Sequence, residues 1–448
     1  MKTVLKILNI GLCLLLAVGV VACAAAPKQA LPAQEAPAYP ETSFIVFSDP
    51  HIYDTSLGTE GKAFEDYLAN DRKLQKESAE ILDSAIEMMK AEKASFVLVP
   101  GDLSKDGERL SHELCAKYLG QLEASGKQVY VVPGNHDILN GYSFKYAGDN
   151  TERVPNVKPE EFAQIYADFG YKQALQRDSA SLSYVAEPQP GLWLLALDAC
   201  LYAQNEEGEE PETDGKFSPQ TLQWTEDMLI KAAKENKAVI AMMHHGIVEH
   251  YIGQQKNYGE YIVDDFPAVS KLLATYNARL VFTGHNHAQD ITVERFPETT
   301  KFVFDIETGS LVTYPCPYRV VSIDASQKAT VRTERVTKIA SHPTDFPQYG
   351  QAYLESGIAG IASRTIQKFG VDKAEADALA GQVAKAFVAH YSGDEKLPAG
   401  QAAISAEGLS ARAKFVVNNR KDLLEGLWAD REPQDNNVTI DLKTGTWQ

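Results

Sequence analysis

The sequence predicts an α/β protein in which two β-sheets pack face to face between outer helices, followed by a small helical C-terminal domain. Three observations predict this fold class. Short runs rich in Val, Ile, Leu and Phe are almost uninterrupted, as in strands buried on both faces. Segments with a helical period alternate with these runs, which is typical of α/β folds. Near Ser341 the composition shifts and a helical pattern takes over.

The apolar runs give the expected strands. They lie at residues 44–47, 96–99, 129–132, 192–197, 239–242, 280–283 and 302–306. A later series at 291–296, 302–306, 318–323 and 330–336 has no long helix between its members. We expect this later series to form an antiparallel run.

The expected helices follow from apolar period and from end signals. Residues 71–90 carry their apolar side chains on one face. A second helix is expected from Ser218, a good N-cap followed by proline, through Leu229. Further helices are expected at 353–369, 373–391 and 409–427, with Gly370 and Gly393 at helix ends. We therefore divide the folded part into a domain of residues 43–340 and a helical domain of residues 341–448.

The N-terminus has the pattern of a targeting segment. Lys2 and Lys6 precede an apolar run that is short for a membrane span and ends at Cys23. Residues 20–23, Val-Val-Ala-Cys, resemble a bacterial lipobox. This resemblance implies a signal peptide at 1–22, lipidation of Cys23, and a lipid-anchored location in the cell envelope. A plain secretory signal or a short N-terminal anchor is the alternative. Residues 23–42, rich in Pro and Ala, are expected to form a tether.

Charge and cysteine content narrow the partners. The formal net charge is −18, so a long nucleic acid would be repelled and polymer binding is not expected. An anionic substrate then requires local positive charge, which bound divalent cations could supply. We expect Cys115, Cys200 and Cys316 to be small buried apolar residues, and a Cys200–Cys316 disulfide stays open. Nothing in the sequence specifies an oligomeric state.

Residues suited to bind metal follow five of the expected strands directly. The five blocks are Asp49-Pro-His51, Gly101-Asp102, Gly134-Asn135-His136-Asp137, His244-His245-Gly246 and Gly284-His285-Asn286-His287. Side chains at the carboxyl ends of sheet strands converge on one crevice. Carboxylates, imidazoles and an amide carbonyl suit Mn, Fe or Zn ions. One such block alone would be weak evidence, but five in order, each after a strand, predict a metal centre.

In order and spacing, these blocks resemble the calcineurin-like metallophosphoesterase family over roughly residues 44–323. The resemblance implies the αββα fold of that family and two divalent metal ions. The implied ligands of the first ion are Asp49, His51 and His287. Those of the second are Asn135, His244 and His285, and Asp102 would bridge the two. His244 fits the family pattern better than His245, which would lie behind the ligands or face the substrate.

The resemblance also implies a mechanism. A hydroxide that bridges the two metals attacks phosphorus in line, and the metals neutralise the developing charge. His136 matches the general acid that protonates the leaving group. Asp137 could orient His136 or could brace the loop, and both roles stay open. The implied partner is a small phosphate-ester substrate.

Departures from family patterns narrow the substrate class. Protein phosphatases carry the second aspartate of GDxVDRG at the position of Lys105, and purple acid phosphatases carry a ligand tyrosine there. Lys105 therefore argues against both of these classes. The stretches 169–171, 181–184 and 283–290 resemble bacterial class III cyclic-nucleotide phosphodiesterases, which implies cleavage of a small phosphodiester, for example a 3′,5′-cyclic nucleotide.

Several positions are candidates for contact with the substrate. The insert 141–178 and the loop 202–216 are expected to rim the site. The individual candidates are His245, His250, Tyr202, Tyr251 and Arg319, and a packing role is open for each. The alternatives for the whole protein are a phosphomonoesterase or nucleotidase of the same superfamily, or a non-catalytic envelope scaffold.

Overall fold

The computed structural model describes residues 36–448, which form one compact unit. The expected signal peptide, Cys23 and most of the expected tether lie outside the described residues. The predicted tether is too long at its end, because Tyr39 is buried and its hydroxyl donates to the carbonyl oxygen of Val239 at 3.0 Å. No helix among residues 36–448 is both long enough and apolar enough to cross a membrane.

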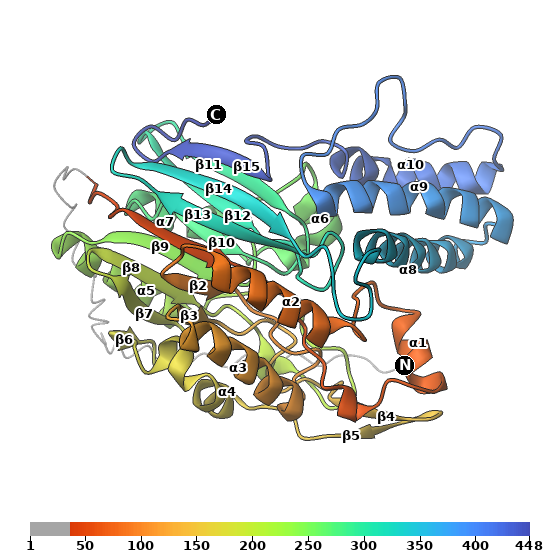
Figure 1. Ribbon diagram of the computed structural model, residues 1–448. Helices are drawn as coiled ribbons and strands as arrows, with labels where there is room; N and C mark the ends of the chain where they lie inside the picture. Colours follow the sequence, from red (N-terminus) through yellow and green to blue (C-terminus); the bar gives the residue numbers. More distant parts are fainter. Residues whose placement is uncertain (1–35) are drawn as a thin grey trace, which may run out of the picture. The chain divides into compact units, whose positions relative to one another are not determined.

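Two large sheets form the centre of the fold (Figure 1). The first has the order β15 (Asn437–Asp441), β14 (Lys328–Arg335), β13 (Pro317–Ile323), β1 (Thr42–Val46), β2 (Phe96–Val99), β3 (Gln128–Val131). The second has the order β11 (Asp290–Phe296), β12 (Lys301–Glu307), β10 (Leu280–Thr283), β9 (Ala238–Met243), β8 (Leu192–Leu197), β7 (Tyr184–Gln189), β6 (Gln176–Arg177). A separate hairpin pairs β4 (Phe144–Ala147) with β5 (Asn150–Arg153).

The sheets pack face to face because their strands are apolar on both faces. Along β9, Ile240 and Met242 belong to the core between the sheets, whereas Val239 and Ala241 belong to a second core under the outer helices. This alternation follows from the two-residue period of a strand. The ring of Phe44 on β1 meets that of Phe282 on β10 edge-on at 5.3 Å, across the interface between the sheets.

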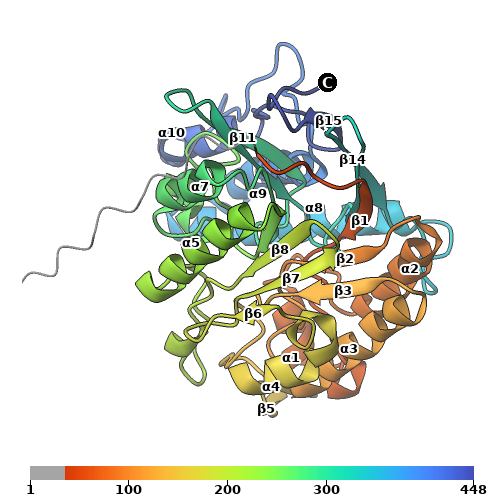
Figure 2. The same cartoon turned by 90° about the vertical axis from the view of Figure 1, so that its left-hand side faces the viewer.

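Helices cover the outer faces of both sheets (Figure 2). The helices α2 (Ser78–Ala91) and α3 (Arg109–Ala124) pack on the first sheet, and α5 (Pro219–Lys234) and α7 (Phe266–Thr275) pack on the second. Ser218 caps α5 as expected, because its hydroxyl accepts the N–H of Thr221 at 3.0 Å. The shorter helices are α1 (Lys62–Leu68), α4 (Pro159–Ile165), α6 (Gln254–Tyr258), η1 (Thr55–Leu57), η2 (Ala167–Tyr171), η3 (Tyr202–Gln204) and η4 (Gly259–Tyr261).

Three expectations need correction. The helix expected at 71–90 begins only at Ser78, because the preceding residues form turns in which the N–H of Leu74 bonds to the carbonyl of Val312. The expected antiparallel run is split, with β11–β12 in the second sheet and β13–β14 in the first. A disulfide is absent among the described cysteines: Cys115, Cys200 and Cys316 are free, and Cys200 is only half-buried.

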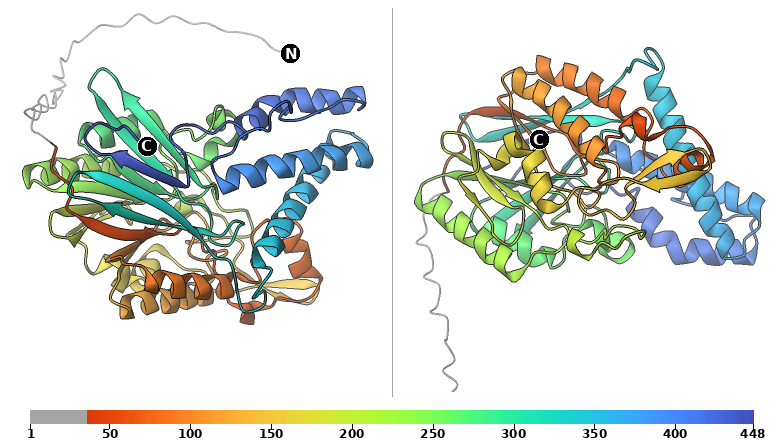
Figure 3. Two further views of the ribbon diagram at one scale, coloured as in Figure 1. Left: turned by 45° about the horizontal axis from the view of Figure 1, so that its top comes forward. Right: turned by 90° about the horizontal axis from the view of Figure 1, so that it is seen from below.

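The C-terminal region contains three long helices, α8 (Phe346–Lys368), α9 (Lys373–Ser392) and α10 (Ala411–Gly426). They lie together at one end of the sheets (Figure 3). The region is not all helical, however. After α10 the chain returns to the first sheet, where β15 pairs antiparallel with β14 and buries Val438 and Ile440. The first sheet therefore contains a strand from the C-terminal region.

Candidate metal centre

The five ligand-bearing blocks meet at one edge of the two sheets. Three follow β1, β2 and β3, and two follow β9 and β10. Parallel strands bring their carboxyl ends to the same edge, and both sets are parallel. The loops are tied directly to one another: the N–H of Asp49 bonds to the carbonyl of Gly101, and that of Gly284 bonds to the carbonyl of His244.

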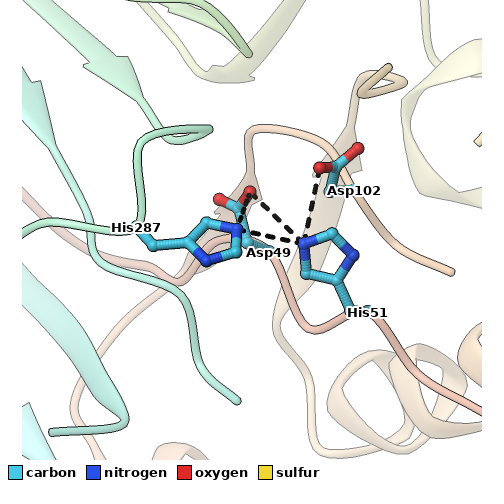
Figure 4. Close-up of side chains that lie close together, drawn as sticks. All are labelled: Asp49, His51, Asp102 and His287. Atoms are coloured by element: carbon cyan, nitrogen blue, oxygen red, sulfur yellow. Dashed lines mark hydrogen bonds and ion pairs between the residues drawn. The ribbon is translucent and has the colours of Figure 1, made fainter. Parts of the chain in front are cut away.

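One group of possible metal ligands contains Asp49, His51, Asp102 and His287 (Figure 4). All four side chains are buried. The Nε2 atoms of His51 and His287 are 3.1 Å apart, and His287 Nε2 is 3.5 Å from Asp49 Oδ1. His51 Nε2 is 3.4 Å from Asp102 Oδ2.

A second group contains Asp102, His244 and His285. His244 Nε2 is 3.3 Å from Asp102 Oδ2 and 3.2 Å from Asn135 Oδ1. The other ring nitrogen of His244 donates to the carbonyl of Pro100 at 2.8 Å, so Nε2 is the nitrogen that faces the group. Asp102 belongs to both groups, so the structure brings together all seven sequence-predicted ligands around one shared carboxylate.

The backbone at this centre is strained. Asp49, His51, Asp102, His285 and His287 all have φ between 35° and 75°. This left-handed region is uncommon for residues other than glycine, and outliers of this kind cluster at functional sites. Five of the seven predicted ligands therefore adopt a conformation that only the surrounding contacts can maintain.

The charge balance of the centre fits bound cations. Burial, followed by the charges of Lys73 and other neighbours, holds the pKa of His51 well below its usual value. Burial likewise lowers the pKa of His285, with His244 adding to the effect. Burial also disfavours ionised Asp102, but His244 and His136 outweigh it, and the pKa of Asp102 is well lowered. Neutral His51 and His285 and ionised Asp102 are in the forms that coordinate divalent metals. His244 differs: burial lowers its pKa, but the charge of Asp102 outweighs burial and raises the pKa to about 9, so His244 must lose a proton when it binds a metal.

His136 lies beside the two groups and is more accessible than their buried ligands, with 23% of its side chain exposed. Its ring is 4.9 Å from that of His51. Its Nδ1 bonds to Asp106 Oδ1 at 2.9 Å, so Nε2 is the nitrogen left for a substrate. Burial lowers the pKa of His136, but Asp102 and then Asp106 reverse this, and the net pKa is raised. A protonated His136 is the form that can donate to a leaving group.

Asp137 does not orient His136. Its two carboxylate oxygens accept the N–H groups of Leu103, Ser104 and Gly134, together with the hydroxyl of Ser104. Asp106, rather than Asp137, bonds to the His136 ring and orients it. Asp137 braces the loop after β2 against the loop after β3. Asp106 was missed because its signal is one acidic residue in a polar loop.

Lys105 takes no place in the metal centre. Its ammonium is fully buried, pairs with Asp106 and lies 3.3 Å from Glu108 Oε1. It also sits 4.3 Å from the ring centroid of Tyr67.

Two further cations were not predicted as part of the site. Lys73 and Arg72 lie just before α2, and their charges act on the pKa of His287. In the sequence they look like ordinary polar residues of an expected helix.

Three of the predicted substrate contacts, His250, Arg319 and Tyr202, are held by bonds within the protein. His250 and Arg319 are wrong as substrate contacts, because both are fully buried in internal bonds. His250 Nδ1 pairs with Asp290 Oδ1 at 2.7 Å, and Arg319 donates to the carbonyl of Asp435 at 2.6 Å. The hydroxyl of Tyr202 donates to Asp198 at 2.9 Å, which is a structural contact.

His245 packs against the metal centre, whereas Tyr251 lines a neighbouring cavity. The ring of His245 packs 4.5 Å from that of His285, and its Nε2 donates to the carbonyl of Thr213 in the loop 202–216. His245 therefore supports a ligand from behind. Burial and the charge of His244 lower its pKa to about 3. Tyr251 is buried and lines a cavity beside the C-terminal helices.

The comparison with protein families gives one clear match. A family model described as calcineurin-like phosphoesterase matches residues 42–289, more than half of the 448 residues. This chain belongs to the calcineurin-like phosphoesterase family. The matched residues contain all five ligand-bearing blocks, and the αββα architecture agrees with the membership. Among curated proteins, no sequence matches.

Solved structures similar to this calcineurin-like phosphoesterase include three hydrolases. A dimetal phosphatase from Danio rerio is 16% identical over 66% of this chain and 97% of that one, with a TM-score of 0.47. A purple acid phosphatase from yellow lupin is 12% identical, covers 67% and 52%, and has a TM-score of 0.42. A putative 5′-nucleotidase from Staphylococcus aureus is 14% identical, covers 71% and 58%, and has a TM-score of 0.38.

Proposed function

We propose that this family member is a dinuclear-metal hydrolase that cleaves a small phosphodiester, with 3′,5′-cyclic nucleotides as one candidate class. The observation that carries the proposal is the pair of ligand groups that share Asp102, with the accessible ring of His136 beside them. The preference for a diester rests on the likeness of residues 169–171, 181–184 and 283–290 to class III cyclic-nucleotide phosphodiesterases.

Each group supplies enough donors for one ion. Asp49, His51 and His287 would hold the first ion, Asn135, His244 and His285 the second, and Asp102 both. Two Mn, Fe or Zn ions held there would activate a water molecule as the nucleophile and neutralise charge on the phosphoryl oxygens. The chain itself provides the remaining functions. Asp106 fixes the imidazole of His136, and His136 Nε2 donates a proton to the departing oxygen.

The choice between diester and monoester can be measured directly. Purified full-length protein loaded with Mn²⁺ is expected to hydrolyse bis-p-nitrophenyl phosphate faster than p-nitrophenyl phosphate. Monoester turnover far above diester turnover would instead identify a phosphomonoesterase or nucleotidase. Less than one metal ion per chain, with no turnover of either ester under several metals, would favour the non-catalytic scaffold.

We also propose that the protein is a lipoprotein of the bacterial cell envelope, attached to the membrane through Cys23. The support is the lipobox-like sequence of residues 20–23. Cyclic nucleotides are made in the cytoplasm, so for a protein anchored outside it another small phosphodiester is the alternative to a cyclic nucleotide. Labelled palmitate should be incorporated into the native chain but not into Cys23→Ser, and equal incorporation into both would exclude this attachment.

A further inference from the structure

A cavity of about 300 Å³ lies between the C-terminal helices and the loops around the metal centre. Its wall on the helical side comes from α8, α9 and α10 and is predominantly apolar, with Thr365 and Arg420 as polar exceptions. The residues that define this wall are Ile361, Leu379, Val383, Phe387, Val417 and Leu424. This volume is at the lower end of the range for small-molecule sites.

The cavity is not explained by the packing of the helices alone. Protein interiors are close-packed, and voids larger than a water molecule are few. Apolar side chains of α8, α9 and α10 divide among three clusters rather than forming one core. Residues of all three clusters line the cavity. The helices therefore line a partly open space that an apolar group could fill with favourable contacts.

The opposite end of the cavity adjoins the metal centre. Asn286, which stands between the ligands His285 and His287, lines it, and so does Tyr261. The ring of Tyr261 packs 4.6 Å from that of His285. Arg72 places a guanidinium at the same end, 5.9 Å from the ring centroid of Tyr391. A phosphate oxygen is a natural partner for such a group.

We infer that the substrate is an amphipathic phosphoester whose alkyl or acyl chain occupies this cavity, while its phosphoryl group lies at the metal centre near Arg72. This inference rests on the proposed phosphoesterase function. An aliphatic chain suits the helical wall, because Ile, Leu, Val and Phe side chains predominate there and gain contact with an alkyl group. The affinity for such substrates should rise with the length of their alkyl chain, since each buried methylene strengthens binding about fourfold.

The test has a binding arm and a kinetic arm. In the binding arm, non-hydrolysable n-alkylphosphonates from ethyl to octyl are titrated into metal-loaded protein by calorimetry. Affinity is expected to rise by up to about fourfold per methylene until the cavity is filled. In the kinetic arm, p-nitrophenyl alkyl phosphodiesters of the same chain lengths are expected to show a KM that falls in parallel.

Variants of α9 make the test specific. Val383→Trp should fill the cavity and reduce octyl affinity at least tenfold while leaving ethyl affinity unchanged. Lys385→Trp, on the exposed side of the same helix, should bind the whole series as the native protein does. Ile361→Phe on α8 provides a second cavity-filling variant if Val383→Trp does not fold.

The outcomes separate this inference from the proposed function. Chain-length-dependent binding without hydrolysis of any ester would support the cavity assignment and overturn the phosphodiesterase. Hydrolysis with no dependence of KM or affinity on chain length would overturn the cavity assignment alone. It would also be overturned if Val383→Trp weakened binding of a nucleoside monophosphate while the alkyl series stayed unchanged.

Discussion

Two aspartates near His136 have different tasks, and their contacts account for the difference. Asp106 accepts one bond from the His136 ring at 2.9 Å and pairs with Lys105. Asp137 accepts bonds only from the loops that hold Asp102 and Asn135. The first therefore acts on the proton donor, and the second acts on the frame of the centre.

We predict that Asp106→Asn lowers kcat by about 10–100-fold for a diester with a poor leaving group, because His136 loses its charged partner. A p-nitrophenyl ester, whose leaving group needs less protonation, should be affected much less. Bound metal, measured by mass spectrometry, should not change. Equal losses on both esters, or loss of metal, would contradict an orienting role for Asp106.

Asp137→Asn is the contrasting variant. Its new amide would face backbone N–H donors in either orientation, so we expect a loss of about 1–3 kcal/mol in the free energy of unfolding. Thermal unfolding measures this directly. An Asp137→Asn variant that keeps native stability but loses the difference between leaving groups would reverse the two assignments.

At the level of elements, the metal centre depends on how closely the loops after the strands approach each other. A Cβ atom at Gly284, after β10, would overlap Ser48 and the carboxylate of Asp49, after β1. A Cβ atom at Gly134, after β3, would overlap Asp102. Glycine at position 284 allows loops of different sheets to approach, and glycine at position 134 does the same for neighbouring loops of the first sheet.

We therefore predict that Gly284→Ala loses metal from the centre, because the loop must move away from Asp49. Metal content per chain after dialysis against Mn²⁺ is the measurement. Gly120→Ala is the matched control, since Gly120 lies in α3 and a Cβ atom there meets nothing within 4 Å. The control should retain full metal content and be equally or more stable. Full occupancy in Gly284→Ala would show that the loop tolerates the displacement.

At the level of the whole molecule, acidic residues gather where the C-terminal segment returns to the sheets. Asp430 follows α10, and Glu395 and Asp394 follow α9. Burial, followed by the charge of Glu395, raises the pKa of Asp430 to about 7. The folded state thus favours the protonated carboxyl. Its stabilising effect is complete below the usual pKa near 3.8 and is lost as the pH rises to 7.

Asp430→Asn removes this titration. In the presence of a chelator, the variant should gain Tm relative to the native protein as the pH rises from 5 to 8, because only the native chain acquires the extra buried charge. Thermal scans of both proteins at the two pH values give the comparison. A difference in Tm that does not change with pH would show that Asp430 does not titrate in this range.

Short-range patterns in the sequence predicted many of the strands and the residues that the structure brings together in the candidate metal centre. Burial on both faces requires an uninterrupted apolar run, so the strands were recognisable locally, and each ligand block follows its strand by a few residues. The start of α2 was predicted too early, because the N–H of Leu74 bonds to the carbonyl of Val312, a residue 238 positions away. The return of β15 to β14 likewise depends on pairing between distant segments, which no local period specifies.

Contacts between residues far apart in the chain decided the rest. His250 and Arg319 have side chains of a type that often contacts substrates, but the packing of the two sheets buries both among internal partners. Asp106 acquired its role because the loops after β2 and β3 meet, and the cavity exists because three helices fail to close on one another. The amino-acid order is enough to specify which groups could do the chemistry. Folding specifies which of them face one another, because burial and distance are properties of the assembled chain.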